Sequence, residues 1–168
     1  TTFNLDEYCE LAPEHPESYS AFMEKHFFGS VNIPFGQAHF PLCDEKSGWA
    51  YEEMIAVLGG IDLQILGIGR NGHIGFNEPG SDFNSRTRVV RLAEETIQDN
   101  SRFFGSVEAA PKTAATMGIG TIMEAREILL LASGAGKAEI IRRALKGPVA
   151  PDVPASVLQR HGNVTIIL

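Results

Sequence analysis

The chain has 168 residues, of which 43% are hydrophobic and 21% are charged, and its formal net charge at pH 7 is −7. This length and composition predict one domain with a substantial core. The acidic balance argues against nucleic acid or an anionic membrane as a partner, because both are usually bound by a concentrated basic face. No apolar run approaches the roughly 20 residues of a membrane span, and a signal-peptide pattern is absent, so we expect a cytoplasmic protein.

Strand-like and helix-like stretches alternate along the chain. In chain order we expect a strand at 2–5, a helix opened by Pro16 that packs through one face, a helix at 49–58, a strand at 61–66, a strand at 88–92, a helix at 94–104, a strand at 127–131, a helix at 137–145, a helix opened by Pro154 and a strand at 164–168. The run at 61–66 is typical of a parallel strand covered on both faces. Prolines and glycines favour irregular structure at 31–48 and 111–120. The alternation predicts an α/β fold with a doubly wound, mostly parallel sheet and helices on both faces.

Cysteine usage and the chain ends give two further expectations. Cys9 and Cys43 are too few for a disulfide scaffold, so we expect two inert thiols in a reducing cytoplasm. Their spacing, and the absence of HExxH or CxxC patterns, predict no metal site. The sequence begins and ends in strand-like runs, which suggests that 1–168 is a single domain without its N-terminal strands and its C-terminal end.

The candidate active site is the loop 67–79 (GIGRNGHIGFNEP), which follows the strand at 61–66. Ligands of open α/β sheets bind beyond the carboxyl ends of strands, where Asn71, His73 and Glu78 would project. A histidine is suited to moving a proton near neutral pH, and a carboxylate five residues later would orient the ring and stabilise its charged form.

The segment 67–72 matches the dinucleotide-binding pattern GxGxxG. That pattern must open a helix, whereas the residues that follow contain two further glycines and a proline, so we expect no nucleotide cofactor. We interpret Gly67, Gly69 and Gly72 as positions where backbone amides approach a small polar ligand. A purely structural tight turn is the alternative.

Three charged residues outside the loop are further candidates. Asp6 would share a sheet edge with His73 if both strands run parallel, and it is either a general base or a turn-capping aspartate. Lys137 stands at the start of a helix that follows a strand. This position weakly favours a role in binding phosphate over that of an ordinary solvated lysine. For Arg102, near the end of its helix, the residues alone favour an ordinary surface position.

Five stretches, taken in order, resemble the glucosamine-6-phosphate deaminase family: FNLDEY (3–8), EHPESY (14–19), GIGRNGHIGFNEPGS (67–81), SRTR (85–88) and NSRFF (100–104). The stretch GHIGFNEP is the most specific of them. The related 6-phosphogluconolactonases share the preceding glycines and histidine but continue differently, so Asn77-Glu78-Pro79 favours the deaminase.

The resemblance implies a Rossmann-like fold and the conversion of glucosamine 6-phosphate and water to fructose 6-phosphate and ammonia, without a cofactor. It assigns Asp6 to proton transfer between C2 and C1, His73 to ring opening and Glu78 to tuning of His73. Many relatives have aspartate where this chain has Asn71, which would support the histidine by hydrogen bonding instead of charge. Arg102 and Lys137 fall where the family holds the phosphate of this amino sugar phosphate.

Two departures from the family pattern stand out. The glycine-serine-threonine phosphate loop that the family carries near its N-terminus is not among residues 1–168, and Val90 stands where the allosterically regulated hexameric relatives use a lysine. We therefore expect no allosteric control, and a monomer or a homo-oligomer. The alternatives are a 6-phosphogluconolactonase-like hydrolase and a catalytically silent protein that binds a sugar phosphate.

Overall fold

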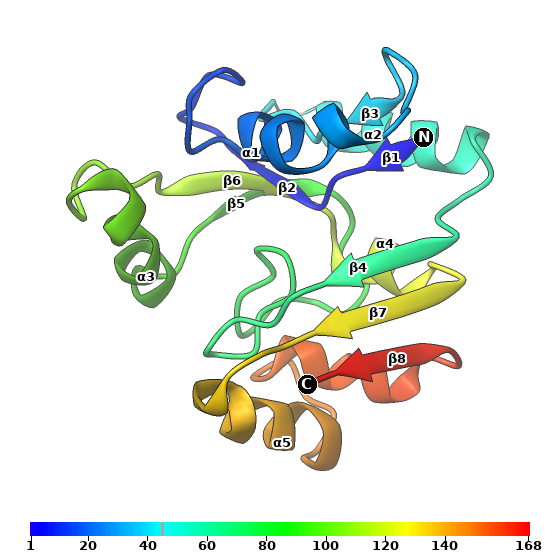
Figure 1. The fold of residues 1–168 in the computed structure, drawn as a ribbon. Coiled ribbons are helices and arrows are strands. Elements are labelled where there is room, and N and C mark those ends of the chain that lie inside the picture. The colour runs from blue at the N-terminus through cyan, green and yellow to red at the C-terminus, as the bar shows by residue number, and fades with distance from the viewer. Residues whose placement is uncertain (45) are drawn as a thin grey trace.

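The computed structural model describes residues 1–44 and 46–168, in which short strands alternate with helices (Figure 1). The strands are β1 (Thr2–Phe3), β2 (Asp6–Tyr8), β3 (Ala38–His39), β4 (Leu63–Leu66), β5 (Arg88–Arg91), β6 (Thr113–Thr116), β7 (Glu127–Leu131) and β8 (Val164–Ile167). The helices are α1 (Tyr19–His26), α2 (Ser47–Val57), α3 (Glu94–Phe104), α4 (Ile119–Met123) and α5 (Ala138–Lys146), with 3₁₀ turns η1 (Phe28–Ser30), η2 (Ala135–Lys137) and η3 (Pro154–Arg160).

The strands form three sheets of mixed direction. Strands β4, β7 and β8 form a parallel sheet in the order β4-β7-β8, and β1 pairs in parallel with β3. Strands β2, β6 and β5 form an antiparallel sheet that leads toward α3, whereas α5 lies beside the parallel sheet (Figure 1). The predicted α/β class is confirmed, but a mostly parallel sheet describes only part of the molecule. Local patterns indicate that a strand forms and do not specify its direction.

The main hydrophobic core lies between the parallel sheet and the helices that pack on it. Leu66 of β4, Ile128 and Leu130 of β7 and Ile119 of α4 are at most 1% exposed. The other face of β4 is open, because Leu63 and Ile65 are 48% and 51% exposed. The expectation of a strand covered on both faces is therefore wrong for the residues that the structure describes.

Two predicted elements differ from the structure near the N-terminus and in the middle of the chain. The first helix begins at Tyr19 and not at Pro16, because the Ser18 hydroxyl caps it by accepting from the Ala21 N–H at 3.0 Å. This helix buries no residue, and Phe22 is 52% exposed. The sequence favours irregular structure at 111–120, but this stretch contains β6, whose sequence TAAT lacks the bulky side chains that usually mark a strand.

Most other elements occur where the sequence predicts them. The helix at 94–104 and the strand at 127–131 have the predicted bounds, and the segment 31–48 is largely a loop apart from β3 and the start of α2, with residue 45 outside the described residues. The described helices include none that is long and apolar enough to cross a membrane.

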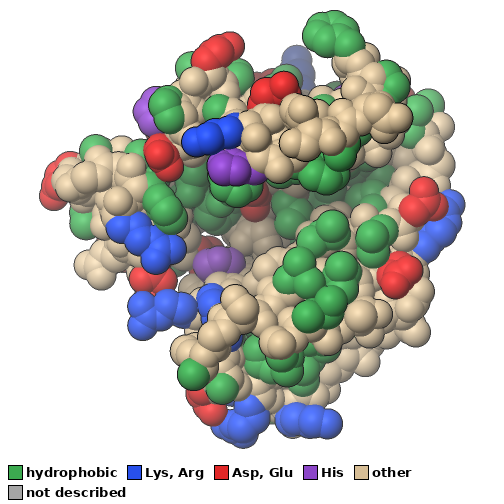
Figure 2. Space-filling view, viewed as in Figure 1, with side chains coloured by type: hydrophobic (Ala, Val, Ile, Leu, Met, Phe, Trp, Pro, Cys, Tyr) green, Lys and Arg blue, Asp and Glu red, His purple; other side chains and the backbone are tan. Residues whose placement is uncertain are grey.

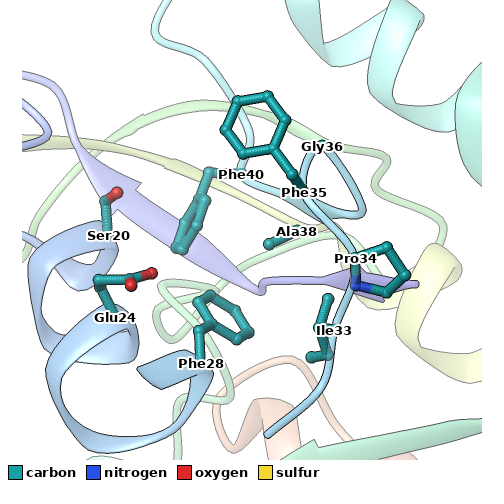
Figure 3. A pocket seen from close by; sticks show the side chains of 9 residues that line it. All are labelled: Ser20, Glu24, Phe28, Ile33, Pro34, Phe35, Gly36, Ala38 and Phe40. Atoms are coloured by element: carbon teal, nitrogen blue, oxygen red, sulfur yellow. The ribbon is translucent and has the colours of Figure 1, made fainter. Parts of the chain in front are cut away.

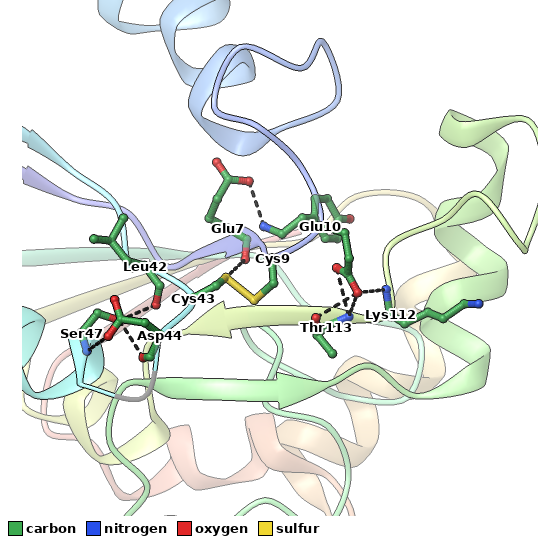
Figure 4. Close-up of a disulfide and its surroundings, with 10 residues drawn as sticks. Glu7, Cys9, Glu10, Leu42, Cys43, Asp44, Ser47, Lys112 and Thr113 are labelled. Atoms are coloured by element: carbon green, nitrogen blue, oxygen red, sulfur yellow. Dashed lines mark hydrogen bonds between the residues drawn. A yellow bond between two sulfur atoms is a disulfide. The ribbon is translucent and has the colours of Figure 1, made fainter.

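The cysteine prediction is wrong. Cys9, directly after β2, and Cys43, before α2, form a disulfide across a sequence separation of 34 residues (Figure 4). The pairing depends on the approach of two distant segments, which the cysteine count and spacing do not reveal. On the same stretch, Glu10 accepts from the Thr113 N–H at 3.0 Å and joins the end of β2 to β6.

Candidate active site

The glycine loop after β4 folds back on itself and places His73 directly over Gly69. The Gly69 N–H donates to the His73 carbonyl at 2.9 Å, and the Gly72 N–H donates to the Gly69 carbonyl at 3.1 Å. A Cβ at Gly69 would lie only 2.2 Å from Cε1 of His73. Gly72 has φ +92, and a Cβ there would lie 2.8 Å from Val153. The tight turn therefore explains why glycine stands at 69 and at 72.

Gly67 has no such structural explanation. Its φ is not in the left-handed region, and a Cβ there would meet no atom within 4 Å. Gly67 lies just beyond the carboxyl end of β4, on an open side of the loop. This is the setting expected for a glycine whose role is to let a ligand approach the backbone, the interpretation that the sequence favours.

His73, Glu78 and Asn71 form one hydrogen-bonded group within the loop. The Asn71 amide donates to Glu78 Oε2 at 2.7 Å, and the Asn71 carbonyl oxygen accepts from the His73 N–H at 3.1 Å. His73 Nδ1 lies 3.4 Å from the same Glu78 oxygen, which makes an ion pair when the ring is protonated. Asn71 therefore holds Glu78 and the His73 backbone together through neutral hydrogen bonds.

Glu78 is kept in its charged form by its partners. Partial burial alone would raise the pKa of this carboxyl, but the close approach of His73 and the hydrogen bonds from Thr96 and Asn71 outweigh burial and lower the pKa to about 2. The Thr96 hydroxyl of α3 donates to Oε1 at 2.5 Å. Above about pH 4 a negative charge therefore lies beside the His73 ring.

Asp6 comes to the same place by a route that the sequence did not predict. It begins β2, opposite Thr116 of β6, in an antiparallel sheet. The Thr116 hydroxyl accepts from the Phe76 N–H at 3.0 Å, which fixes the loop against this sheet. A Cβ at Gly75 would lie 3.6 Å from Asp6 Oδ2, so the Asp6 carboxylate abuts the loop that carries His73. The prediction of a shared sheet edge is wrong, because β2 and β4 belong to different sheets and β2 pairs antiparallel with β6. Asp6 is near the loop because the sheet of β2 packs against Gly75.

The environment of Asp6 suits a proton acceptor near neutral pH. Burial, and then the nearby carboxylate of Glu7, raise the pKa of Asp6 from its ordinary value of 3.8 to about 7. Figure 2 shows that this face of the molecule is hollowed between its upper and lower parts, and that a histidine side chain lies in the hollow.

The two predicted phosphate ligands differ. Lys137, at the end of η2, donates from Nζ to the Ile68 carbonyl at 2.7 Å, which places its ammonium group beside the start of the glycine loop. Arg102 is exposed on α3, with its guanidinium 4.6 Å from the Phe103 ring centre. Among the described residues, no hydrogen bond or ion pair links the side chains of Arg102 and Lys137.

Sequence reasoning missed two residues that hold the loop. Asn77 is fully buried, and its amide donates to the carbonyls of Ile74 and Met117 at 2.9 Å each. Its place in the specific stretch GHIGFNEP was the available signal. Thr96 had no local signal, because its partner Glu78 lies 18 residues away in the sequence.

Two other features bear on the search for a site. Within residues 1–44 and 46–168, no three His, Cys, Asp or Glu side chains are grouped so that they could hold a metal ion.

A cavity of about 540 Å³ lies between α1, η1 and the segment 33–40, lined largely by Phe28, Phe35 and Phe40 (Figure 3). It includes none of the predicted site residues.

Comparisons with known proteins bear on the resemblance. Residues 1–167 match the family of glucosamine-6-phosphate isomerases and 6-phosphogluconolactonases. The chain is 57% identical to a glucosamine-6-phosphate deaminase of Rhodopirellula baltica, over all of this chain and 68% of that protein. It is 56% identical to glucosamine-6-phosphate deaminase 2 of Bacillus subtilis, over 99% of this chain and 70% of that protein.

Solved structures agree with the sequence relatives. A monomeric glucosamine-6-phosphate deaminase superposes with a TM-score of 0.95 at 47% identity, over 99% of this chain and 70% of that one. A 6-phosphogluconolactonase from Trypanosoma cruzi shares the fold, with a TM-score of 0.72 at 22% identity over 97% of this chain and 67% of that one. The predicted resemblance is confirmed: this chain belongs to the family of glucosamine-6-phosphate isomerases and 6-phosphogluconolactonases.

Proposed function

We propose that this chain deaminates glucosamine 6-phosphate, with water as co-substrate and with fructose 6-phosphate and ammonia as products. The observation that carries the proposal is the Asp6 carboxylate beside Gly75, in the loop that also holds the grouped His73, Glu78 and Asn71. Identity above 50% to deaminases of two organisms supports the same reaction.

The first chemical step is opening of the sugar ring. It requires a proton to leave the hydroxyl at C1 and a proton to reach the ring oxygen. His73 is suited to both transfers, because Glu78 stabilises the protonated ring and Asn71 fixes the backbone that carries it. The ring is partly exposed, with 21% of its side-chain surface accessible, so a substrate can reach it.

Asp6 then moves the proton between the two carbons. The aldehyde at C1 makes the hydrogen on C2 acidic, and the Asp6 carboxylate removes it while O1 gains a proton, which leaves a C1–C2 double bond. Return of the proton to C1 produces a ketimine at C2, and water hydrolyses the ketimine to the ketone and ammonia. A carboxyl with a pKa of about 7 is suited to both halves of this transfer, because it gives up the proton as readily as it accepts it.

The phosphate would lie beyond the carboxyl ends of β4 and β7. Gly67 leaves open space there, and Lys137 supplies a positive charge from η2. Arg102 on α3 would add a second cation by reaching across from the other side of the site.

The proposed function is tested by incubating the protein with glucosamine 6-phosphate and measuring ammonia and fructose 6-phosphate together. We expect both products in equal amounts, without added metal or cofactor. Hydrolysis of 6-phosphogluconolactone without ammonia release would contradict the proposal and favour the lactonase alternative. Thermal stabilisation by glucosamine 6-phosphate without turnover would favour the silent sugar-phosphate-binding protein.

Three finer expectations belong to the same proposal. We propose a monomer or a homo-oligomer, and the 47% identical solved deaminase described as monomeric favours the monomer. We also propose a Rossmann-like, doubly wound arrangement and a cytoplasmic location. The disulfide removes the cysteine argument for that location, which now depends on the metabolic role of the relatives.

A further inference from the structure

Thr96 contacts the acid–base group from outside the loop, and this contact lies beyond the roles given to Asp6, His73, Glu78 and Asn71. Its hydroxyl donates to Glu78 Oε1 at 2.5 Å, and the residue is 4% exposed. Among the described residues, Oε1 accepts a hydrogen bond from Thr96. Oε2 accepts from the Asn71 amide at 2.7 Å and lies 3.4 Å from His73 Nδ1. The two carboxylate oxygens are therefore divided between α3 and the loop.

We propose that Thr96 is a positioning residue, whose hydroxyl fixes the rotation of the Glu78 carboxylate so that Oε2 stays directed at His73. This inference rests on the proposed deaminase function and names a residue that acts through Glu78. A carboxylate held at one oxygen can still turn about its last bond, because that torsion has a broad energy minimum. Held at both oxygens from two elements, it keeps one orientation.

The helix that carries Thr96 is anchored independently of this hydroxyl. Ile97 packs with Tyr8 and Phe76 in a hydrophobic cluster separate from the main core, and the Asn100 amide donates to the Tyr8 hydroxyl at 3.0 Å. Removal of the Thr96 hydroxyl should therefore leave α3 in place. A purely structural role, in which Glu78 merely satisfies a buried hydroxyl, predicts a loss of stability without a change in chemistry.

The charged groups around Glu78 are few, so a pH readout can be interpreted. Within the loop, His73 is the titratable side chain that faces Glu78. On α3, Asp99 is paired with Arg70 at 3.2 Å, and on β2, the Asp6 carboxylate lies beside Gly75. Loss of the Thr96 hydrogen bond would raise the pKa of Glu78 from about 2 toward its ordinary value of 4.5.

The test compares Thr96→Val, which removes the hydroxyl and keeps the shape, with Thr96→Ser, which keeps the hydroxyl. Deaminase activity of the parent is measured first, so that its absence would refute the proposed function and not this inference. We expect Thr96→Val to lower kcat about tenfold, with KM unchanged and with a steeper loss of activity below about pH 5. Thr96→Ser should restore both properties.

Ser101→Ala is the matched control on the same helix, because the bond that the Ser101 hydroxyl makes among the described residues is to the Gln98 carbonyl of its own helix, at 2.7 Å. It should leave kcat and the pH profile unchanged. Thr96→Ala replaces the valine variant if the latter does not fold. A folded variant without the hydroxyl but with parental kcat and pH profile would overturn the inference, as would Thr96→Ser being as impaired as Thr96→Val.

Discussion

The proposed acid–base region, around Asp6, His73 and Glu78, and the proposed anion-binding region, at Lys137 and Arg102, are built in opposite ways. In the acid–base region, Glu78 is hydrogen-bonded from two elements, and the Asp6 carboxylate lies against Gly75. In the anion-binding region, Arg102 is exposed over Phe103 and Lys137 makes one bond to a carbonyl. Proton transfer needs groups placed to a fraction of an ångström, whereas a long cationic side chain can adjust to a phosphate. The fold therefore holds the proposed proton-transfer groups more rigidly than the side chains proposed to bind the phosphate.

The largest effect should come from Asp6→Asn in the acid–base region. Asparagine cannot accept the proton from C2, so we expect kcat to fall about 10³-fold or more, within the range for a well-placed general base. Ammonia release measured on the purified, folded variant checks this. Asp62→Asn is the control, because the Asp62 side chain is 90% exposed and pairs with Arg126. Near-parental turnover by Asp6→Asn would show that another group is the base.

Two glycines only two positions apart test the preorganisation directly. An alanine at 69 would put a Cβ 2.2 Å from the His73 ring, whereas an alanine at 67 would meet nothing within 4 Å. We expect Gly69→Ala to lower kcat about 10²-fold through displacement of His73. Gly67→Ala should leave kcat and thermal stability near the parental values and raise KM. Equal effects of the two substitutions on kcat would mean that the loop adjusts to the added methyl group at residue 69 without displacing His73.

The sequence groups three candidates of the proposed acid–base region because they lie close together along the chain. Asn71, His73 and Glu78 lie in one short loop, and the strand before it is recognisable from its apolar run. The sequence did not predict contacts between distant segments. The hydrogen bond of Thr96 with Glu78 and the Cys9–Cys43 disulfide join segments that no periodicity relates. Strand direction failed for the same reason, since β2 and β6 pair through residues about a hundred positions apart.

The anion-binding region should respond in KM and not in kcat. Lys137→Ala and Arg102→Ala should each raise KM for glucosamine 6-phosphate about 10- to 100-fold, because a hydrogen bond to a charged group contributes about 1.5–3 kcal/mol. Arg142→Ala is the control, since Arg142 pairs with Glu139 on the exposed face of α5. A kcat loss with unchanged KM would place either residue in the acid–base region. Parental kinetics would remove it from the site.

The pKa of Asp6 should set the acidic side of the rate profile. Since the base must be ionised, kcat/KM should fall about tenfold per pH unit below pH 7. Between about pH 4 and 7 the folded state holds a proton that the unfolded chain has released, so raising the pH through this window lowers the free energy of unfolding. Asp6→Asn should abolish that stability trend. A profile that is flat down to pH 5 would contradict a raised pKa.

The smallest effect on activity is expected from the disulfide, in which Cys9 directly follows β2, the strand that carries Asp6. Closing a loop between Cys9 and Cys43, 34 positions apart, should stabilise the folded state by about 3–4 kcal/mol through restriction of the unfolded chain. Reduction, or Cys9→Ser with Cys43→Ser, should therefore lower the denaturant midpoint while kcat stays near parental. If kcat fell with the midpoint, the orientation of Asp6 would depend on the disulfide. Unchanged kcat would show that bonds between the loop and β6, such as that of Phe76 with Thr116, suffice to hold the acid–base region.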